Sequence, residues 1–487
     1  MNKSPGTATE SLCELSACTA RAMIGRRQIS PVELTQACIE RIELINPSVN
    51  AMVATDYEVA LASAREAEQA VMRGDELGPL HGLPLGVKDL NVTAGLRTTF
   101  GSRLHADWIP ERDERLIAAL RHAGAIVIGK TNTPEFGAGA NTVNDVYGAT
   151  VNPFDTTRTC GGSSGGSAVA LATDMAPICT GSDTGGSLRT PASFCGVVSI
   201  RGTPGTVPSD RRGIGLTTYN VQGPMARSVA DASLMLSGFA GGDVCDPLHR
   251  PHDPAIYQHI EPVDLSTLRV AYSEDLGFAP IDNDIRAVFR DRIAAIAGWL
   301  RSCEPHDPQM STASEVFWLI RGMHFLAGRY EHYEQEKASL GPNNRSNIEA
   351  ALQMRPESIA WAMAEQTRIY RAFQSFFDSH DVLICPTAAV SPFPVDQLYC
   401  DTINGERLPN YIKWVDICAG LTLTGHPIVQ LPCGVDHLGM PFGLQIVGPA
   451  LHSDRFVIGV AAALEAMFAQ DPRLCRPRPD IEALARR

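Results

Sequence analysis

The chain has 487 residues, of which 44% are hydrophobic and 20% are charged, an ordinary composition for a globular protein. Its formal net charge of −13 argues against a nucleic-acid partner, which usually needs a basic surface, and gives no support for binding to an acidic membrane. The thirteen cysteines include no C-x-x-C pair and no Cys/His cluster with zinc spacing, so the sequence predicts no zinc site.

The sequence also carries no sign of export or membrane insertion. The N-terminal stretch M-N-K-S-P-G-T-A-T-E-S-L-C-E-L has acidic residues and no apolar core, so we do not predict a secretory signal. The most continuous apolar helix candidate begins at Phe456, is too short to span a bilayer and contains Glu465. We therefore expect a soluble, cytoplasmic protein.

The first part of the chain, residues 1–75, is predicted to be helical, because apolar residues recur at helical spacing from residue 9 onward. The stretch S-P-V-E-L-T-Q-A-C-I-E-R-I has the features of a helix N-terminus. Ser30 is placed as the N-cap, Pro31 as the first helical residue and Glu33 as the third.

Residues 76–265 alternate between short apolar runs and helical stretches, which predicts an α/β sheet. The apolar runs have the character of strands buried on both faces. They are L-P-L-G-V (83–87), A-I-V-I (125–128) and V-V-S-I (197–200), separated by E-R-L-I-A-A-L-R-H-A (114–123) and S-A-V-A-L-A (167–172).

Residues 266–380 are predicted to be a helical insertion on the substrate side, because residues 280–380 are charged and helical in pattern. Strand-like runs resume in 381–487, with D-V-L-I-C-P-T and F-G-L-Q-I-V-G-P. We therefore expect one sheet built from both sides of the insertion.

Two motif matches fail because their structural context is wrong. G-A-I-V-I-G-K-T (124–131) satisfies the phosphate-loop pattern, but its four variable positions form a strand and Pro134 interrupts the helix that should follow. G-G-S-S-G-G (161–166) satisfies the nucleophile-elbow pattern, but the polar N-P-F-D-T-T-R-T-C precedes it instead of a buried strand.

Lys88 is unusual because it lies inside the apolar, strand-like H-G-L-P-L-G-V-K-D-L. One interpretation is a lysine whose stem packs while its ammonium reaches water. The other is a buried amine, whose pKa desolvation lowers, so that it becomes a general base near pH 7.

Two Gly/Ser clusters follow, C-G-G-S-S-G-G-S (160–167) and G-S-D-T-G-G-S-L-R (181–189). They are either flexible linkers or a site made of serine hydroxyls and backbone N–H groups. With Lys88 as base, they would supply a nucleophile, a hydroxyl relay and an oxyanion hole whose donors contribute roughly 2.7–4 kcal/mol each.

These segments resemble the amidase signature family of serine hydrolases, in that family's order. The similar segments are G-V-K-D (86–89), G-K-T-N-T-P-E-F (129–136), C-G-G-S-S-G-G-S (160–167), G-S-D-T-G-G-S-L-R-T-P-A-S-F-C-G (181–196) and G-P-M-A-R-S-V-A-D-A (223–232). The resemblance implies an α/β fold with a single large mixed sheet flanked by helices.

Carried over residue by residue, the resemblance implies a Ser-cis-Ser-Lys triad. Ser187 would attack the amide carbonyl, Ser163 would relay the proton and unprotonated Lys88 would receive it. The peptide between Gly162 and Ser163 would be cis.

The same resemblance implies an oxyanion hole and no metal or organic cofactor. The hole would be formed by Thr184, Gly185, Gly186 and the N–H of Ser187. The neighbouring polar residues are expected to be structural: Ser164 and Ser167 as turn and helix-cap serines, Asp183 and Arg189 as partners in the loop, and Cys160 and Cys179 as inert packing. The histidines, including His81 and His426, show no ligand spacing.

Three functions remain open. The first is a stand-alone amidase that releases a carboxylate and an amine or ammonia from a small-molecule amide, as a monomer or a homodimer, and that also cleaves esters or carbamates as some family members do. The second is a glutamine-hydrolysing subunit of an amidotransferase, in which Thr190 would replace a common glutamine. The third is a non-catalytic binding protein.

Substrate preference is not readable from these motifs. S-I-R-G-T-P-G (199–205) departs from the G-L-K-P-T-x-G that the family often has. Aromatic residues and methionines in 317–333 and 361–363 either line an apolar pocket or belong to the core, and 392–394 and 410–414 are candidate rim segments.

Overall fold

The computed structural model describes residues 11–486. The first ten residues of the stretch for which we predict no secretory signal lie outside this range. Within it, no helix combines the length and the apolar character needed to cross a bilayer.

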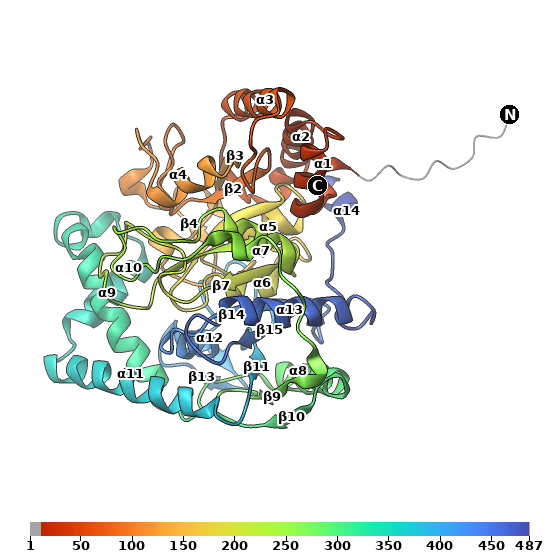
Figure 1. Cartoon of the computed structure of the whole chain (residues 1–487). Coiled ribbons are helices and arrows are strands. Elements are labelled where there is room, and N and C mark those ends of the chain that lie inside the picture. Colours follow the sequence, from red (N-terminus) through yellow and green to blue (C-terminus); the bar gives the residue numbers. More distant parts are fainter. Residues whose placement is uncertain (1–10, 487) are drawn as a thin grey trace.

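A large sheet runs through the centre of the molecule (Figure 1). Its eleven strands, in spatial order, are β1 (Met52–Ala54), β3 (Ile126–Thr131), β2 (Pro84–Lys88), β6 (Ile178–Asp183), β8 (Val221–Ala226), β7 (Val198–Arg201), β14 (Ile428–Val435), β15 (Pro441–Val447), β11 (Val382–Pro386), β9 (Arg269–Tyr272) and β10 (Ser302–Pro305). Pairing is parallel in β3–β2–β6 and β11–β9–β10 and antiparallel elsewhere. The expected single mixed sheet is confirmed.

Helices flank this sheet. In chain order they are α1 (Ala17–Gly25), α2 (Pro31–Val49), α3 (Tyr57–Arg73), α4 (Arg115–His122), α5 (Gly165–Ala172), α6 (Arg189–Phe194), α7 (Val229–Ser237), α8 (Asn283–Ile296), α9 (Ala313–Glu336), α10 (Pro342–Leu352), α11 (Pro356–Phe376), α12 (Asp416–Thr422), α13 (Asp454–Phe468) and α14 (Ile481–Ala485). The C-terminal α14 packs on α2, so both ends of the described chain lie on the same side of the molecule (Figure 1).

Short elements complete the fold. Two small two-stranded sheets pair β4 (Val143–Asn144) with β5 (Gly148–Ala149) and β12 (Thr402–Ile403) with β13 (Glu406–Arg407). The 3₁₀ helices are η1 (Leu12–Glu14), η2 (Arg103–His105), η3 (Glu135–Gly137), η4 (Pro254–Tyr257), η5 (Leu265–Thr267), η6 (Ala297–Trp299), η7 (Lys337–Ser339) and η8 (Lys413–Val415).

The predicted start of α2 is confirmed. The Ser30 side chain accepts a hydrogen bond from the amide of Val32, and the Ser30 amide donates to Glu33 Oε2 at 2.8 Å. The N-cap serine and the first turn thus bond to each other's free amides, and Pro31, which has no amide hydrogen, is the first residue of the helix.

The expectation of purely helical segments needs correction at two places. β9 and β10 lie within residues 266–380 and extend the sheet beyond β11, and β1 lies within residues 1–75 and forms the opposite edge. Each is only three or four residues long, too short for its apolar pattern to stand out from the neighbouring helices. The boundaries of the four predicted segments remain a prediction.

Two neighbouring strands bring the Gly/Ser clusters to Lys88. β2 and β6 run parallel, so their carboxyl ends, Lys88 and Asp183, lie at the same edge of the sheet. α5 follows the first cluster and is buried all round. A Cβ on its Gly166 would lie 2.2 Å from the backbone nitrogen of Asn132, so only glycine lets α5 approach the end of β3 this closely.

Gly166→Ala should therefore lower the free energy of unfolding by about 3 kcal/mol, because the added methyl group meets rigid backbone. Gly328→Ala is the matched control, since a Cβ at this position in α9 meets nothing within 4 Å. It should stabilise the protein by about 0.5–1 kcal/mol through helix propensity. Urea denaturation of both variants measures the difference, and equal midpoints would contradict the close approach.

Candidate functional site

Lys88 is a buried amine, as the second interpretation of the sequence proposes. It is the last residue of β2, is 0% exposed, and its Nζ lies 2.8 Å from Ser163 Oγ, 2.8 Å from Ser164 Oγ and 3.0 Å from Ser182 Oγ. Burial lowers the pKa of Lys88 from 10.5 to about 7, while the negative charge of Asp183 acts in the opposite direction.

Ser163 lies between Lys88 and the surface of the site. The peptide bond between Gly162 and Ser163 is cis. The amide of the next residue, Ser164, donates to the backbone carbonyl of Ser187 at 3.2 Å, so the two Gly/Ser clusters are bonded directly to each other.

The two serines expected to be structural behave differently. Ser164 occupies the N-cap position of α5, but its side chain does not cap the helix and instead contacts the Lys88 amine. This corrects the helix-cap expectation, because a buried amine competes for the hydroxyl. Ser167 is inside α5, and its hydroxyl donates to the carbonyl of Thr180 at 2.8 Å, so it joins the helix to β6.

Ser187 lies in the turn between β6 and α6 and is partly exposed. Glycine is required beside it, because Gly186 has φ +113° and a Cβ on Gly185 would lie 2.8 Å from Phe317 Cζ. The Gly186 amide donates to Asp183 Oδ1 at 2.9 Å, whereas the amides of Thr184, Gly185 and Ser187 have no hydrogen-bond partner within residues 11–486.

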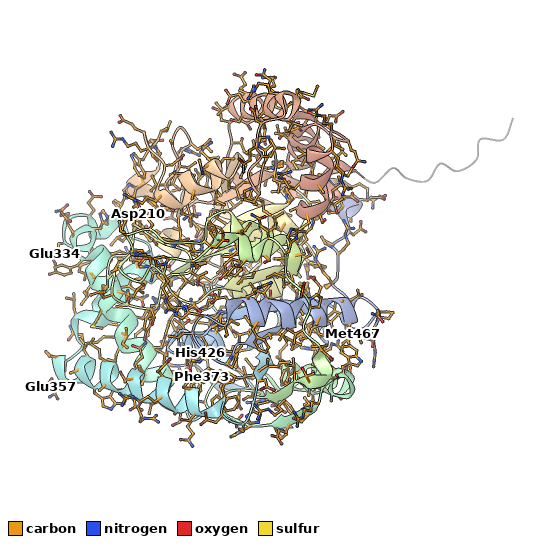
Figure 2. The ribbon with its side chains drawn as sticks, in the orientation of Figure 1. Asp210, Glu334, Glu357, Phe373, His426 and Met467 are labelled. Carbon is orange, nitrogen blue, oxygen red and sulfur yellow. The ribbon has the colours of Figure 1, made fainter. Side chains whose placement is uncertain are left out.

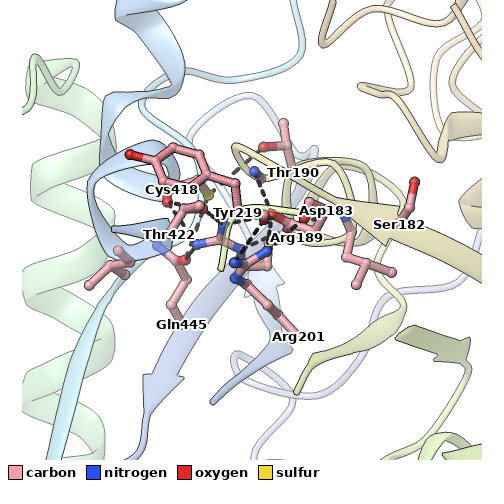
Figure 3. A network of polar contacts seen from close by, with 12 residues as sticks. Ser182, Asp183, Arg189, Thr190, Arg201, Tyr219, Cys418, Thr422 and Gln445 are labelled. Carbon is pink, nitrogen blue, oxygen red and sulfur yellow. Dashed lines mark hydrogen bonds and ion pairs between the residues drawn. The ribbon is translucent and has the colours of Figure 1, made fainter. Parts of the chain in front are cut away.

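Asp183 holds this turn in a network of buried charges (Figure 3). Its carboxylate accepts from Arg189 Nη2 at 2.9 Å, Arg201 Nη1 at 3.0 Å and the amide of Leu188 at 3.1 Å. Although burial alone would raise the pKa of Asp183, the two guanidinium groups hold it well below its ordinary value. Asp183 and Arg189 are thus structural partners of the loop, as expected.

The loop that departs from the family pattern, residues 199–205, contributes through Arg201. Besides binding Asp183, the Arg201 guanidinium donates to the carbonyl of Tyr219 at 3.1 Å. Through Arg201, the last residue of β7, this segment therefore supports the turn that carries Ser187.

The rejected phosphate-loop match is a strand, as predicted. Residues 126–131 form β3, and Lys130 is buried within it, donating to Thr93 Oγ1 at 2.8 Å and to the carbonyl of Asn91. Its amine thus bonds to protein groups in the interior.

A cavity of about 630 Å³ opens over this site. Ser163, Ser182, Thr184, Gly185 and Ser187 form part of its wall. Helix α9 contributes Phe317, Arg321, His324, Phe325, Arg329 and His332.

The residues that line the cavity show which of the aromatic side chains face a pocket. Phe317 and Phe325 line it, whereas Trp361 and Met363 on α11 are 39% and 57% exposed and do not. Of the two candidate rim segments, 410–414 contributes Ile412 to the wall, and Phe393 in the other is buried in the core.

His426, Cys160 and Cys179 are buried in the interior. His426 packs against Phe373 with ring centroids 4.8 Å apart (Figure 2), and burial lowers its pKa to about 4. Burial also raises the pKa of the Cys160 and Cys179 thiols to about 12. Among residues 11–486, no three His, Cys, Asp or Glu side chains are grouped so as to hold a metal ion.

Sequence reasoning missed Ser182, the third hydroxyl on the Lys88 amine. It lies two residues after Thr180 on β6, so both side chains face the same way, and Thr180 Oγ1 accepts from the Lys88 amide at 2.8 Å. The alternation T-G-S, next to a strand that ends in lysine, is the signal that could have revealed it.

Comparisons with known proteins agree with this architecture. The Amidase family model matches residues 33–457. An acylamidase of Rhodococcus erythropolis is 33% identical over 457 residues, which cover 93% of this chain and 95% of that protein. A glutamyl-tRNA(Gln) amidotransferase subunit of Moorella thermoacetica is 31% identical over 487 residues, covering 94% and 97%.

Among solved structures, a bacterial aryl acylamidase of the amidase signature enzymes superposes with a TM-score of 0.84 at 26% identity, covering 93% of this chain and 96% of that one. The chain therefore belongs to the amidase signature family and is an enzyme that hydrolyses amides.

Proposed function

We propose that the protein is a stand-alone amidase that cleaves linear amides through an acyl-enzyme on Ser187. The observation that carries this proposal is the contact of the buried Lys88 Nζ with Ser163 Oγ at 2.8 Å. Ser163 in turn lies in the wall of the cavity that Ser187 also lines. A serine hydroxyl becomes an effective nucleophile only when a base removes its proton in place.

The three contacts of the Lys88 amine fit a neutral group. A neutral amine has two N–H donors and one lone pair, so it can donate to two of its hydroxyl neighbours and accept from the third. The proton of Ser187 then passes to Ser163 Oγ, whose own proton passes to Lys88 Nζ, while Ser187 Oγ bonds to the amide carbon.

The negative oxygen that results needs donors close to Ser187. The free amides of Thr184, Gly185 and Ser187 are suited to this role, and each such donor contributes roughly 2.7–4 kcal/mol. Since the Gly186 amide is bonded to Asp183, we propose that Gly186 positions the loop rather than binding the oxyanion, in contrast to the prediction from the resemblance.

The acyl-enzyme then forms when the C–N bond breaks. Lys88 returns its proton through Ser163 to the leaving nitrogen, which departs as an amine or ammonia, and a water molecule hydrolyses the ester to release the carboxylate. Esters and carbamates would enter the same route, because each presents a carbonyl carbon to Ser187.

The alternative is a glutamine-hydrolysing subunit, since the amidotransferase subunit of Moorella thermoacetica is similar over nearly the whole chain. Thr190, which occupies the position of the common glutamine, directs its hydroxyl to Cys418 Sγ at 3.9 Å, within the core. Turnover of simple aryl or alkyl amides by the purified chain supports the stand-alone amidase. Activity that requires glutamine and a partner protein supports the alternative, and a homodimer remains a prediction.

Ser187→Ala should abolish turnover of chromogenic amides, with a loss of about 10⁶-fold in kcat, because no other hydroxyl is placed to form the acyl-enzyme. A fluorophosphonate probe followed by mass spectrometry should modify Ser187 in the wild type and in Ser164→Ala, and should leave Ser187→Ala unmodified. Absence of an adduct in the wild type would favour a non-catalytic binding protein.

The rate should rise with pH through the pKa of Lys88, about 7. Below this value the amine holds a proton and cannot accept another, and above it the neutral base predominates. Lys88→Ala should lower kcat/KM by about 10²–10⁴-fold at pH 7. The loss should be smaller at pH 9, where hydroxide partly replaces the base.

Lys88→Arg is the control for charge, because an arginine stays protonated and cannot act as a base. It should be as inactive as Lys88→Ala at both pH values. Full activity in either variant would refute the proposed role of Lys88.

Asp183→Asn should destabilise the fold by about 3–5 kcal/mol, because it leaves two buried guanidinium groups without their counter-charge. Asp471→Asn is the control, since Asp471 pairs with Arg473 at the surface and its loss should change stability by less than about 1 kcal/mol. Urea denaturation compares them, and equal effects would contradict the structural role of Asp183.

A further inference from the structure

One face of α9 brings positive charge to the cavity, and the proposed reaction mechanism does not involve this charge. Phe317, Arg321, Phe325 and Arg329 recur at every fourth position, so they lie in one row along the helix, and all four line the cavity. The Phe317 ring lies against Gly185, beside Ser187. At a rise of about 1.5 Å per residue, Arg321 is about 6 Å further along the helix axis and Arg329 about 18 Å.

Arg321 is buried without an acidic partner. It is 7% exposed, its Nη2 donates to Tyr411 Oη at 2.6 Å, and its guanidinium lies 4.3 Å from the centre of the Phe325 ring. These neutral contacts leave the positive charge uncompensated, and burial lowers the pKa of Arg321.

Arg329 is half-buried and likewise bonds to neutral groups. Its Nη2 donates to the carbonyl of Phe136 at 2.8 Å, and its guanidinium lies over the rings of Phe325 and Phe136 at 4.9 and 5.3 Å. Its Nε is buried and has no hydrogen-bond partner in the part of the chain that the structure describes. Burial lowers the pKa of Arg329 to about 10, so the group still carries its charge at neutral pH.

Two carboxylates of this region are bonded to other groups, although the charge of the first also acts to raise the pKa of Arg329. The first is Glu135, which accepts from Ser102 Oγ at 2.8 Å and from the Gly341 amide at 2.7 Å. The other is Glu114, on the cavity wall, which accepts from Asn91 Nδ2 at 2.6 Å. Among residues 11–486, neither Arg321 nor Arg329 forms an ion pair within 4.0 Å.

Charges buried without a partner are costly, and arginine, with its planar fork of donors, binds carboxylates especially well. We infer that the row of α9 is a subsite for a carboxylate on the acyl part of the substrate. The scissile amide lies at Ser187, the connecting chain crosses Phe317 and Phe325, and the distal carboxylate binds Arg321 or Arg329. The subsite rests on the proposed amidase function.

The test compares three amides of equal chain length: the monoamide of a dicarboxylic acid, the unsubstituted alkanamide and the ω-amino alkanamide. Series that run from glutaric acid to a sixteen-carbon dicarboxylic acid span the axial distances of about 6 and 18 Å to the two arginines. We expect kcat/KM for the carboxylated amide to exceed that of the neutral one by at least tenfold at the best length, and the amino amide to be the poorest substrate.

At least one of the two variants, Arg321→Gln or Arg329→Gln, should reduce the ratio of kcat/KM for the carboxylated and neutral amides at least tenfold. The change should come mainly from KM. Arg321→Lys keeps the charge and should keep part of the preference. Tyr411→Phe removes the hydrogen-bond partner of Arg321 without changing charge, so the ratio of the two kcat/KM values should stay within about threefold of wild type. Equal preference in all variants, or a wild-type preference for neutral or amino amides, would overturn the subsite.

A binding measurement separates this inference from the proposed function. In the Ser187→Ala protein, adipic acid monoamide at millimolar concentration should raise Tm more than hexanamide does, and Arg321→Gln or Arg329→Gln added to Ser187→Ala should remove the difference. If the wild type turns over no amide and takes no fluorophosphonate, the amidase proposal fails while the thermal shift still tests the arginines. If amides are turned over but the shift is equal for both ligands, only the subsite fails.

Discussion

The buried carboxylate of Asp183, lying between Arg189 and Arg201, is the constraint on which the rest of the site depends. Its oxygens accept hydrogen bonds from the amides of Gly186 and Leu188 on either side of Ser187, so the turn is held in place at the proposed nucleophile. The turn belongs to no regular element, and backbone outside helices and strands needs such partners to keep one conformation.

Asp183 also bears on the protonation of Lys88. Its negative charge favours the ammonium form of Lys88. Burial of the amine is the larger influence and lowers its pKa to about 7. The carboxylate that holds the turn therefore opposes the loss of the Lys88 proton without preventing it.

Much of this arrangement was predictable because its signals are local. Lys88 stands out as a charged residue at the end of a run buried on both faces, and the Gly/Ser clusters stand out because glycine and serine gather where α5 begins and β6 ends. Ser30 and Glu33 likewise predict the start of α2 through contacts three residues apart. Each of these features is decided by neighbours along the chain, which the sequence shows directly.

The features that escaped prediction depend on distant partners. Ser164 has the position of a helix cap, but its hydroxyl binds the Lys88 amine, 76 residues away in the sequence. β9 and β10 are strands because β11 offers them an edge, and Phe317 lines the cavity because α9 docks on Gly185. Local pattern contains none of this information.

The residues proposed for the chemistry lie within 88–187, whereas much of the cavity wall comes from α9, which begins at Ala313. The two parts come close at Gly185, where the lack of a side chain admits the Phe317 ring. Side-chain exchanges along this single helix would therefore alter what the cavity accepts while leaving the proposed proton relay in place.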